Sequence, residues 1–85
     1  MKKFQYEVKD ELGLHARPAA VLAKEAKRFE SIITVSDGVK SVQATQMLQL
    51  MSMGVKKGQT LVVTAEGEDE EEAALAIHAF FCDNL

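Results

Sequence analysis

His15 is the residue of this sequence whose type and neighbours most clearly suggest chemistry. It lies in the segment 13–19, which reads GLHARPA, at the expected start of a helix. A helix N-terminus offers unpaired backbone N–H groups and a partial positive charge, and both attract phosphate. The guanidinium of Arg17 can bind the same phosphate oxygens. The neutral imidazole can therefore attack phosphorus to form a phosphoramidate, whose added negative charge the helix end and Arg17 would stabilise.

Two simpler interpretations compete with this one. A lone histidine near a helix start is more often a capping or surface residue. His78 and Cys82 lie one turn apart in the expected last helix, but two side chains do not make a zinc site, which needs three or four protein ligands. We therefore expect no metal. The lability of a P–N bond, in which charged imidazole is a good leaving group, favours a carrier over a permanent modification.

The residues 16–29 have the spacing of an amphipathic helix that would hold His15 at its start. Their apolar side chains form one stripe with helical periodicity: Ala19, Leu22, Ala23, Ala26 and Phe29. Pro18 falls in the first turn, where its missing N–H does no harm. The pattern therefore predicts His15 at or near the N-cap.

Alternating and helical patterns divide the rest of the chain into four strands and two further helices. We expect strands at 3–8, 32–36, 39–44 and 59–66, and helices at 46–53 and after residue 69. Asp37-Gly38 predicts a hairpin, because both residues tolerate positive φ. The order β-α-β-β-α-β-α in one short chain predicts a two-layer α+β fold with one face of the sheet covered.

The helix ends carry their own signals. Gly54 is suited to end the short helix. Asp69, with Glu72 three residues later, predicts a capping box for the last helix. The expected buried face of that helix comprises Ala73, Ala74, Ile77, Phe80 and Phe81.

Length and composition restrict the class of protein. A chain of 85 residues with 47% hydrophobic residues is expected to form one domain, 1–85. A net charge of −3 argues against a nucleic-acid partner, although Arg17, Lys24, Lys27 and Arg28 form a local basic cluster. Cys82 has no second cysteine to pair with. The N-terminus lacks the apolar run of a signal peptide and no stretch is long enough to span a bilayer, so we expect a cytoplasmic protein without membrane insertion, and a monomer.

The segment 13–20 resembles the active-site signature of the histidine-containing phosphocarrier (HPr) family of the bacterial phosphotransferase system. The similarity extends along the chain to Phe29 and to the segments 37–38, 51–54 and 65–70, which match the family in residue type and spacing. The short motif is moderately specific, and its combination with agreement over the full length is very specific.

The resemblance implies an open-faced β-sandwich, in which a four-stranded antiparallel sheet carries three helices on one face. It implies that His15 accepts a phosphoryl group at Nδ1 from Enzyme I, itself charged by phosphoenolpyruvate, and passes it to the EIIA domains of sugar permeases. Ala16 and Arg17 would bind the phosphate at the helix start. Such a protein is a covalent carrier and not an enzyme, and no cofactor is implied.

A surface for such partners is expected beside His15. Arg17 lies on one helical face with part of this docking surface, which we define as Ala20, Lys24, Lys27, Met47, Leu48 and Met51. By spacing, Leu50 and Met53 are better candidates for the core, so we expect Met47, Leu48 and Met51 to be exposed. Methionine side chains adapt to several partners, and the lysines would attract acidic ones.

One position departs from the family pattern. Many Gram-positive members have a serine at the start of the short helix, where a dedicated ATP-dependent kinase phosphorylates it, and this chain has Gln46. Glutamine cannot take that phosphate, so the regulatory serine site is expected to be absent. Thr45 could serve as the N-cap or as a shifted phosphate acceptor, and we expect the N-cap. Ser52 has no special claim to be a phosphorylation site.

Three functions remain open at this stage. The first is a phosphocarrier for sugar uptake. The second is a paralogous regulatory phosphocarrier of the nitrogen type, which would also keep His15 and Arg17. The third is a non-phosphorylated binding module of ferredoxin-like build.

Overall fold

The computed structural model describes residues 1–85, and its elements follow one another in the expected order. They are β1 (Lys2–Glu7), α1 (Ala16–Ala26), β2 (Ile32–Ser36), β3 (Ser41–Gln43), α2 (Met47–Ser52), β4 (Thr60–Glu66) and α3 (Glu70–Asn84). None of the three helices is both long enough and apolar enough to cross a membrane.

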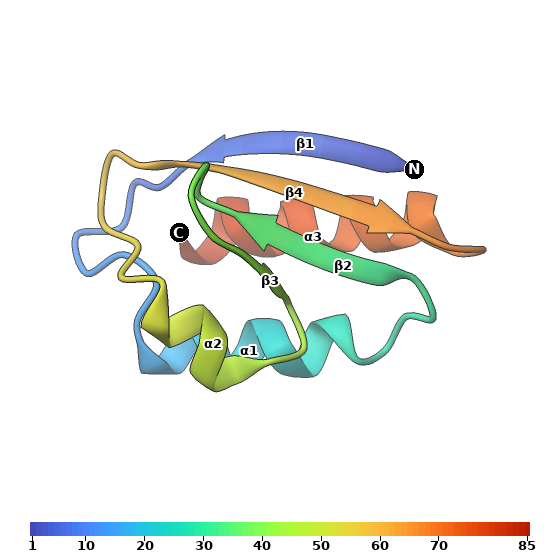
Figure 1. The fold of residues 1–85 in the computed structure, drawn as a ribbon, viewed down its shortest axis with the longest axis horizontal. Helices are drawn as coiled ribbons and strands as arrows, with labels where there is room; N and C mark the ends of the chain where they lie inside the picture. Colours follow the sequence, from blue (N-terminus) through green and yellow to red (C-terminus); the bar gives the residue numbers. More distant parts are fainter.

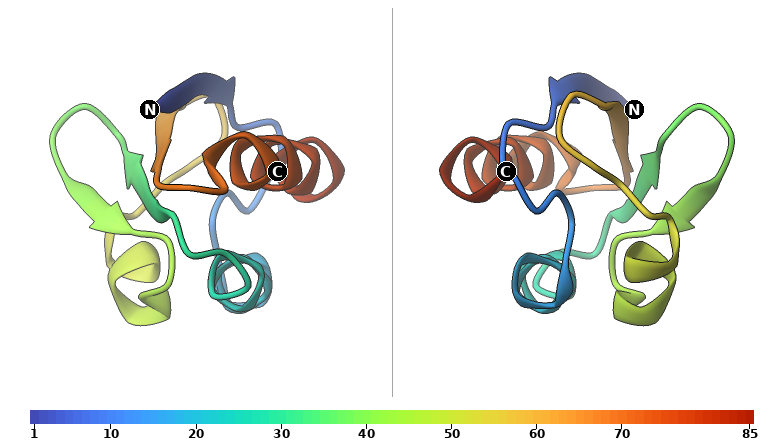
Figure 2. Two further views of the ribbon diagram at one scale, coloured as in Figure 1. Left: turned by 90° about the vertical axis from the view of Figure 1, so that its right-hand side faces the viewer. Right: turned by 90° about the vertical axis from the view of Figure 1, so that its left-hand side faces the viewer.

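The four strands form one antiparallel sheet in the order β1-β4-β2-β3 (Figure 1). The register places Phe4 opposite Val63 and Thr34 opposite Thr64. All three helices lie on one side of this sheet, as the end views in Figure 2 show. The predicted α+β open-faced sandwich is therefore confirmed.

The two faces of the sheet differ in polarity because successive side chains of a strand point to opposite sides. In β4, Leu61, Val63 and Ala65 are buried, whereas Val62 and Thr64 between them are only half-buried. The buried face meets Leu22 of α1, Leu50 of α2, and Ile77 and Phe81 of α3, all of them fully inaccessible. The predicted inward face of the last helix is confirmed, with Ala74 at its half-buried margin.

The helix that follows His15 is shorter than predicted. It ends at Ala26 and not at residue 29, because the next amides turn to nearer carbonyls: Arg28 N–H donates to Glu25 and Phe29 N–H to Ala26, at 3.1 and 3.3 Å. These i to i−3 bonds are typical of a tightened final turn. Phe29 still packs against the core from the connection that follows.

The predicted hairpin between β2 and β3 exists, but its turn is wider than expected and the second strand begins at Ser41. Only Gly38 has a positive φ, of 94°. The Asp37 carboxylate holds the turn instead, by accepting the N–H groups of Val39 and Lys40 at 2.9 and 2.7 Å. An Asp side chain that accepts the N–H groups of its own turn stabilises that turn, so Asp37 does not need a positive φ.

The two predictions of side-chain capping are wrong. The N-cap of α2 is Gln46 and not Thr45, and it makes no side-chain capping bond. Asp69 does occupy the N-cap of α3, but no capping box with Glu72 forms. Its carboxylate instead accepts hydrogen bonds from the backbone N–H groups of Glu30 and Ser31, at 2.9 Å each, and from the Ser31 hydroxyl at 2.5 Å.

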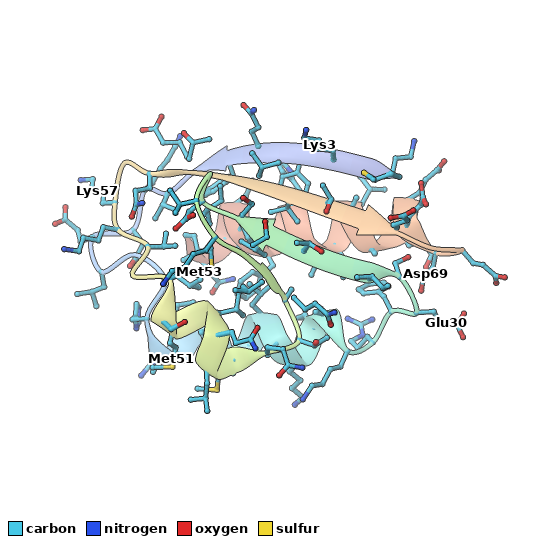
Figure 3. All side chains as sticks on the ribbon, viewed as in Figure 1. Lys3, Glu30, Met51, Met53, Lys57 and Asp69 are labelled. Carbon is cyan, nitrogen blue, oxygen red and sulfur yellow. The ribbon has the colours of Figure 1, made fainter.

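Asp69 therefore ties the start of α3 to the connection between α1 and β2, and Figure 3 shows Asp69 and Glu30 at the same end of the molecule. The hydrogen bond from the Ser31 hydroxyl, followed by that from the Glu30 backbone, holds the pKa of the Asp69 carboxyl below its ordinary value. A carboxyl with a lowered pKa stabilises the fold above its unfolded pKa, and that contribution is lost as the pH falls towards the lower folded value.

We expect Asp69→Asn to lower the free energy of unfolding at neutral pH and to weaken its decline below about pH 4. Urea unfolding at several pH values measures both effects. Glu68→Gln is the matched control, because the Glu68 carboxylate makes no hydrogen bond or ion pair, and it should keep the wild-type stability at neutral pH. Equal pH profiles for Asp69→Asn and the wild type would contradict the assignment.

Candidate functional site

The loop between β1 and α1 is fixed at both ends before it reaches His15. The backbone N–H groups of Lys9 and Asp10 donate to a main-chain oxygen of Leu85, the latter at 2.7 Å, and Leu14 N–H donates to the Val55 carbonyl at 3.1 Å. Gly13 has a φ of +66° and packs directly against the backbone of residues 55–56. These contacts fix the loop, and the loop in turn positions His15 at the start of α1.

His15 is the N-cap of α1, as predicted. Its backbone is extended, with φ −103° and ψ −172°, and its carbonyl accepts the first helical hydrogen bond from Ala19 N–H at 3.0 Å. The imidazole makes no capping hydrogen bond, and 38% of the side chain is exposed. The His15 side chain therefore does not cap the helix, and its ring is accessible to a reactant.

The first turn of α1 presents free donors beside this ring. The N–H groups of Ala16 and Arg17 precede the first residue that can reach a helical carbonyl, and no side chain accepts them. Pro18 lacks an N–H group and is buried on the other side of the turn. The guanidinium of Arg17 is exposed and makes no ion pair. The site therefore combines an accessible imidazole, two unbonded amides and one free cation.

One carboxylate lies next to the His15 ring. Oδ2 of Asp10 is 3.9 Å from Nε2 of His15. No group of three or more histidine, cysteine or acidic side chains is placed to hold a metal ion. The pair formed by His78 and Cys82 lies on α3, with the sulfur 3.9 Å from Nδ1 of His78.

The structure brings the predicted docking surface together on α1 and α2, which pack side by side (Figures 1 and 2). Lys24 and Lys27 are exposed and make no ion pair, whereas Arg28 is paired with Glu25 at 2.9 Å. Leu48 is 79% exposed and Met51 37%. Ala20 is half-buried.

Met47 differs from the prediction of an exposed side chain: it is half-buried and packs against the core. It lies in the first turn of a six-residue helix, one turn before the fully buried Leu50, and so faces the same side. Leu50 and Met53 are buried as predicted. Figure 3 shows Met51 on the outer side of α2. The exposed apolar part of the docking surface is therefore Leu48 and Met51.

Three residues around the site have no counterpart in the sequence-based prediction. Leu12 is 71% exposed in the loop before His15, and Val21 is 43% exposed on α1 beside Lys24. Asp10 is the third. The sequence could have indicated an exposed Leu12, because it is a single leucine in a polar loop. It could not have indicated Asp10, because the approach of Asp10 to His15 depends on how the loop folds back.

The chain is similar to known proteins over nearly its whole length. Residues 2–83 match the family model described as the PTS HPr component phosphorylation site. The phosphocarrier protein HPr of Mycoplasma pneumoniae is 45% identical, over 93% of this chain and 91% of its own length. The HPr-like protein Crh of Halalkalibacterium halodurans is 44% identical, over 94% of this chain and 95% of its own.

A solved structure gives the same result for the fold. The histidine-containing phosphocarrier protein studied for the divergence of Mycoplasma from Gram-positive bacteria superimposes with a TM-score of 0.94. It is 39% identical, and the match covers 96% of this chain and 93% of that one. The chain therefore belongs to the HPr family, the non-catalytic phosphocarrier proteins of the phosphotransferase system.

Proposed function

We propose that His15 accepts a phosphoryl group at Nδ1 from phosphorylated Enzyme I and passes it to the EIIA domains of sugar permeases. The observation that carries this proposal is the accessible, unbonded imidazole at the N-cap of α1, beside the free N–H groups of Ala16 and Arg17. The relatives named phosphocarrier protein HPr support the same role.

In the forward step, the lone pair of Nδ1 forms a bond to phosphorus while the bond between phosphorus and the donor breaks and its electron pair returns to the donor. The amides of Ala16 and Arg17 and the Arg17 guanidinium would bind the phosphoryl oxygens, because all three donors are free in the unphosphorylated chain. The onward step reverses this, with the electron pair of the P–N bond returning to Nδ1. These fixed donors lower the barrier in both directions without holding the product permanently.

The two kinds of partner would use the same docking surface in turn. Leu48 and Met51 supply its exposed apolar part, and Lys24 and Lys27 supply unpaired positive charge. An apolar centre with a charged rim gives rapid encounter with an acidic partner and modest affinity. A carrier needs both properties, because it must leave each partner quickly.

The similarity to the HPr-like protein Crh raises repression as a second role, since a related structure is described as the catabolite repression HPr. That role would need a phosphorylated serine at the start of α2, as in many Gram-positive members of the family. Gln46 occupies this position and has no hydroxyl group. Gln46 therefore argues against the repression role. The regulatory alternative of the nitrogen type keeps His15 and Arg17 as well, and the preferred EIIA partner distinguishes it from the sugar-uptake relay.

The test is to incubate the purified protein with Enzyme I, magnesium and phosphoenolpyruvate, and to record its intact mass and phosphorus NMR spectrum. We expect one added, acid-labile phosphoryl group with the shift of a phosphoramidate. Addition of EIIA should then discharge it. A chain that takes no label, while a known HPr is labelled in parallel by the same Enzyme I, would overturn the proposal.

Leu48→Asp should weaken the interaction with both Enzyme I and EIIA by about tenfold, because it places a charge in the apolar centre of the docking surface. Titration of labelled chain with each partner measures the dissociation constant. Leu75→Asp is the matched control: Leu75 is 73% exposed on α3, beside Lys2 and Lys3 and outside the docking surface. Equal losses of affinity in the two variants would contradict the placement of the surface.

A further inference from the structure

The carboxylate of Asp10 is held in place next to the His15 ring. Its Oδ2 lies 3.9 Å from Nε2 of His15, and both side chains are a little over one third exposed. The same Oδ2 accepts the N–H of Leu12 at 3.0 Å. On the backbone, Asp10 N–H donates to Leu85 at 2.7 Å and its carbonyl accepts Gly13 N–H at 3.0 Å. Three hydrogen bonds thus fix a residue that would otherwise be a mobile surface acid.

We propose that Asp10 is a positioning residue for phosphoryl transfer, which keeps the imidazole proton of His15 on Nε2 so that Nδ1 presents its lone pair. A neutral imidazole carries one proton, and a carboxylate next to one nitrogen favours the proton on that nitrogen. The role of Nδ1 as the nucleophile rests on the proposed function above.

The same carboxylate acts during the transfer itself. When Nδ1 bonds to phosphorus, the donor bond breaks and its electron pair returns to the donor, and the ring gains positive charge while its proton stays on Nε2. The negative charge of Asp10 stabilises that cation. On onward transfer the electron pair of the P–N bond returns to Nδ1, and the ring is again the neutral Nε2–H form, ready for the next cycle.

No other acidic side chain competes for this role. Asp10 is the one carboxylate that lies within 4 Å of a His15 nitrogen. The neighbouring acid, Glu11, is engaged with Lys57 at 3.0 Å on the outside of the loop. Arg17 is a cation and would stabilise phosphate oxygens and not a ring proton.

The direct readout is the nitrogen-15 NMR spectrum of the His15 ring, which distinguishes the Nε2–H and Nδ1–H tautomers in the unphosphorylated protein. Asp10→Asn keeps a neutral oxygen for Leu12 N–H and removes the negative charge that lies next to Nε2. We expect the ratio of Nε2–H to Nδ1–H to fall about fivefold, the size expected for a partly exposed charge contact. The single-turnover rate of phosphorylation by Enzyme I should also fall, because the fraction of the Nε2–H form decreases and the ring cation loses the negative charge that stabilises it.

Glu11→Gln is the control, because it removes the same charge from the next residue without contact with the ring. It should leave the tautomer ratio and the rate unchanged. The Leu12 amide resonance reports whether the loop is still folded in Asp10→Asn. A merely structural role of Asp10 would change the loop resonances and leave the tautomer ratio as it was.

Three results would overturn the inference: a dominant Nδ1–H form in the wild-type protein, an unchanged ratio in a folded Asp10→Asn variant, or an equal shift in Glu11→Gln. The wild-type spectrum alone decides the first, so the inference stays testable even if the variant does not fold. A shifted ratio in a chain that takes no phosphoryl group would overturn the proposed function and leave the placement of the proton by Asp10 intact.

Discussion

His15→Ala should remove every phosphoryl group that Enzyme I and phosphoenolpyruvate place on this chain. The imidazole is the one nucleophile at the start of α1, where the free amides of Ala16 and Arg17 can bind phosphate. Alanine leaves those amides in place but supplies no lone pair to attack phosphorus. Because 38% of the His15 side chain is exposed and it makes no capping bond, the substitution should change the free energy of unfolding by less than about 1 kcal/mol.

The measurement is intact mass after incubation with the donor, together with thermal unfolding of the same sample. His78→Ala is the matched control, since it removes the other histidine. His78 lies in the middle of α3 with its ring 4.9 Å from that of Phe4, away from any helix start. We expect His78→Ala to take one phosphoryl group as the wild type does. Label that survives in His15→Ala, or disappears in His78→Ala, would assign the chemistry to another residue.

The local arrangement around His15 could be predicted from the sequence, because the residues beside it are close in the chain. Ala16, Arg17 and Pro18 follow within three residues, so helix geometry alone sets their relation to the ring. The order of strands and helices was equally accessible, because periodicity of side chains reports which face is buried. Both parts of the prediction depend on short stretches of chain.

The predictions that were wrong or incomplete concern side chains that could bond either to a neighbour in sequence or to a distant residue. Asp69 has the sequence context of a capping box, yet its carboxylate binds the backbone of Ser31, 38 residues away. Asp10 reaches His15 only because the loop is held by Leu85. Which of these bonds forms depends on how distant helices, strands and loops pack together. A local sequence pattern does not report that packing.

We expect Gly13→Ala to destabilise the fold strongly, because Gly13 lies in the loop that leads to His15 and packs against the backbone of residues 55–56. Gly13 has a φ of +66°, and an added Cβ would fall on the carbonyl oxygen of Val55 and within 2.8 Å of the Lys56 Cα. Both are backbone atoms and cannot rotate away as a side chain could. We expect the free energy of unfolding to fall by about 3 kcal/mol, from the strain of positive φ together with the overlap. The loop should also move His15 away from the start of α1 and slow its phosphorylation.

Gly54→Ala separates these two causes, because Gly54 has the same φ of +66° but nothing within 4 Å of an added Cβ. Its free energy of unfolding should fall only by the cost of positive φ, about 1 kcal/mol, and its rate of phosphorylation should equal that of the wild type. Urea unfolding and single-turnover labelling of both variants make the comparison. Equal losses of stability would mean that φ alone accounts for Gly13. A larger loss of stability in Gly13→Ala would show that the close approach of the loop to residues 55–56 stabilises the fold. Slower labelling of that variant alone would show that this approach also positions His15.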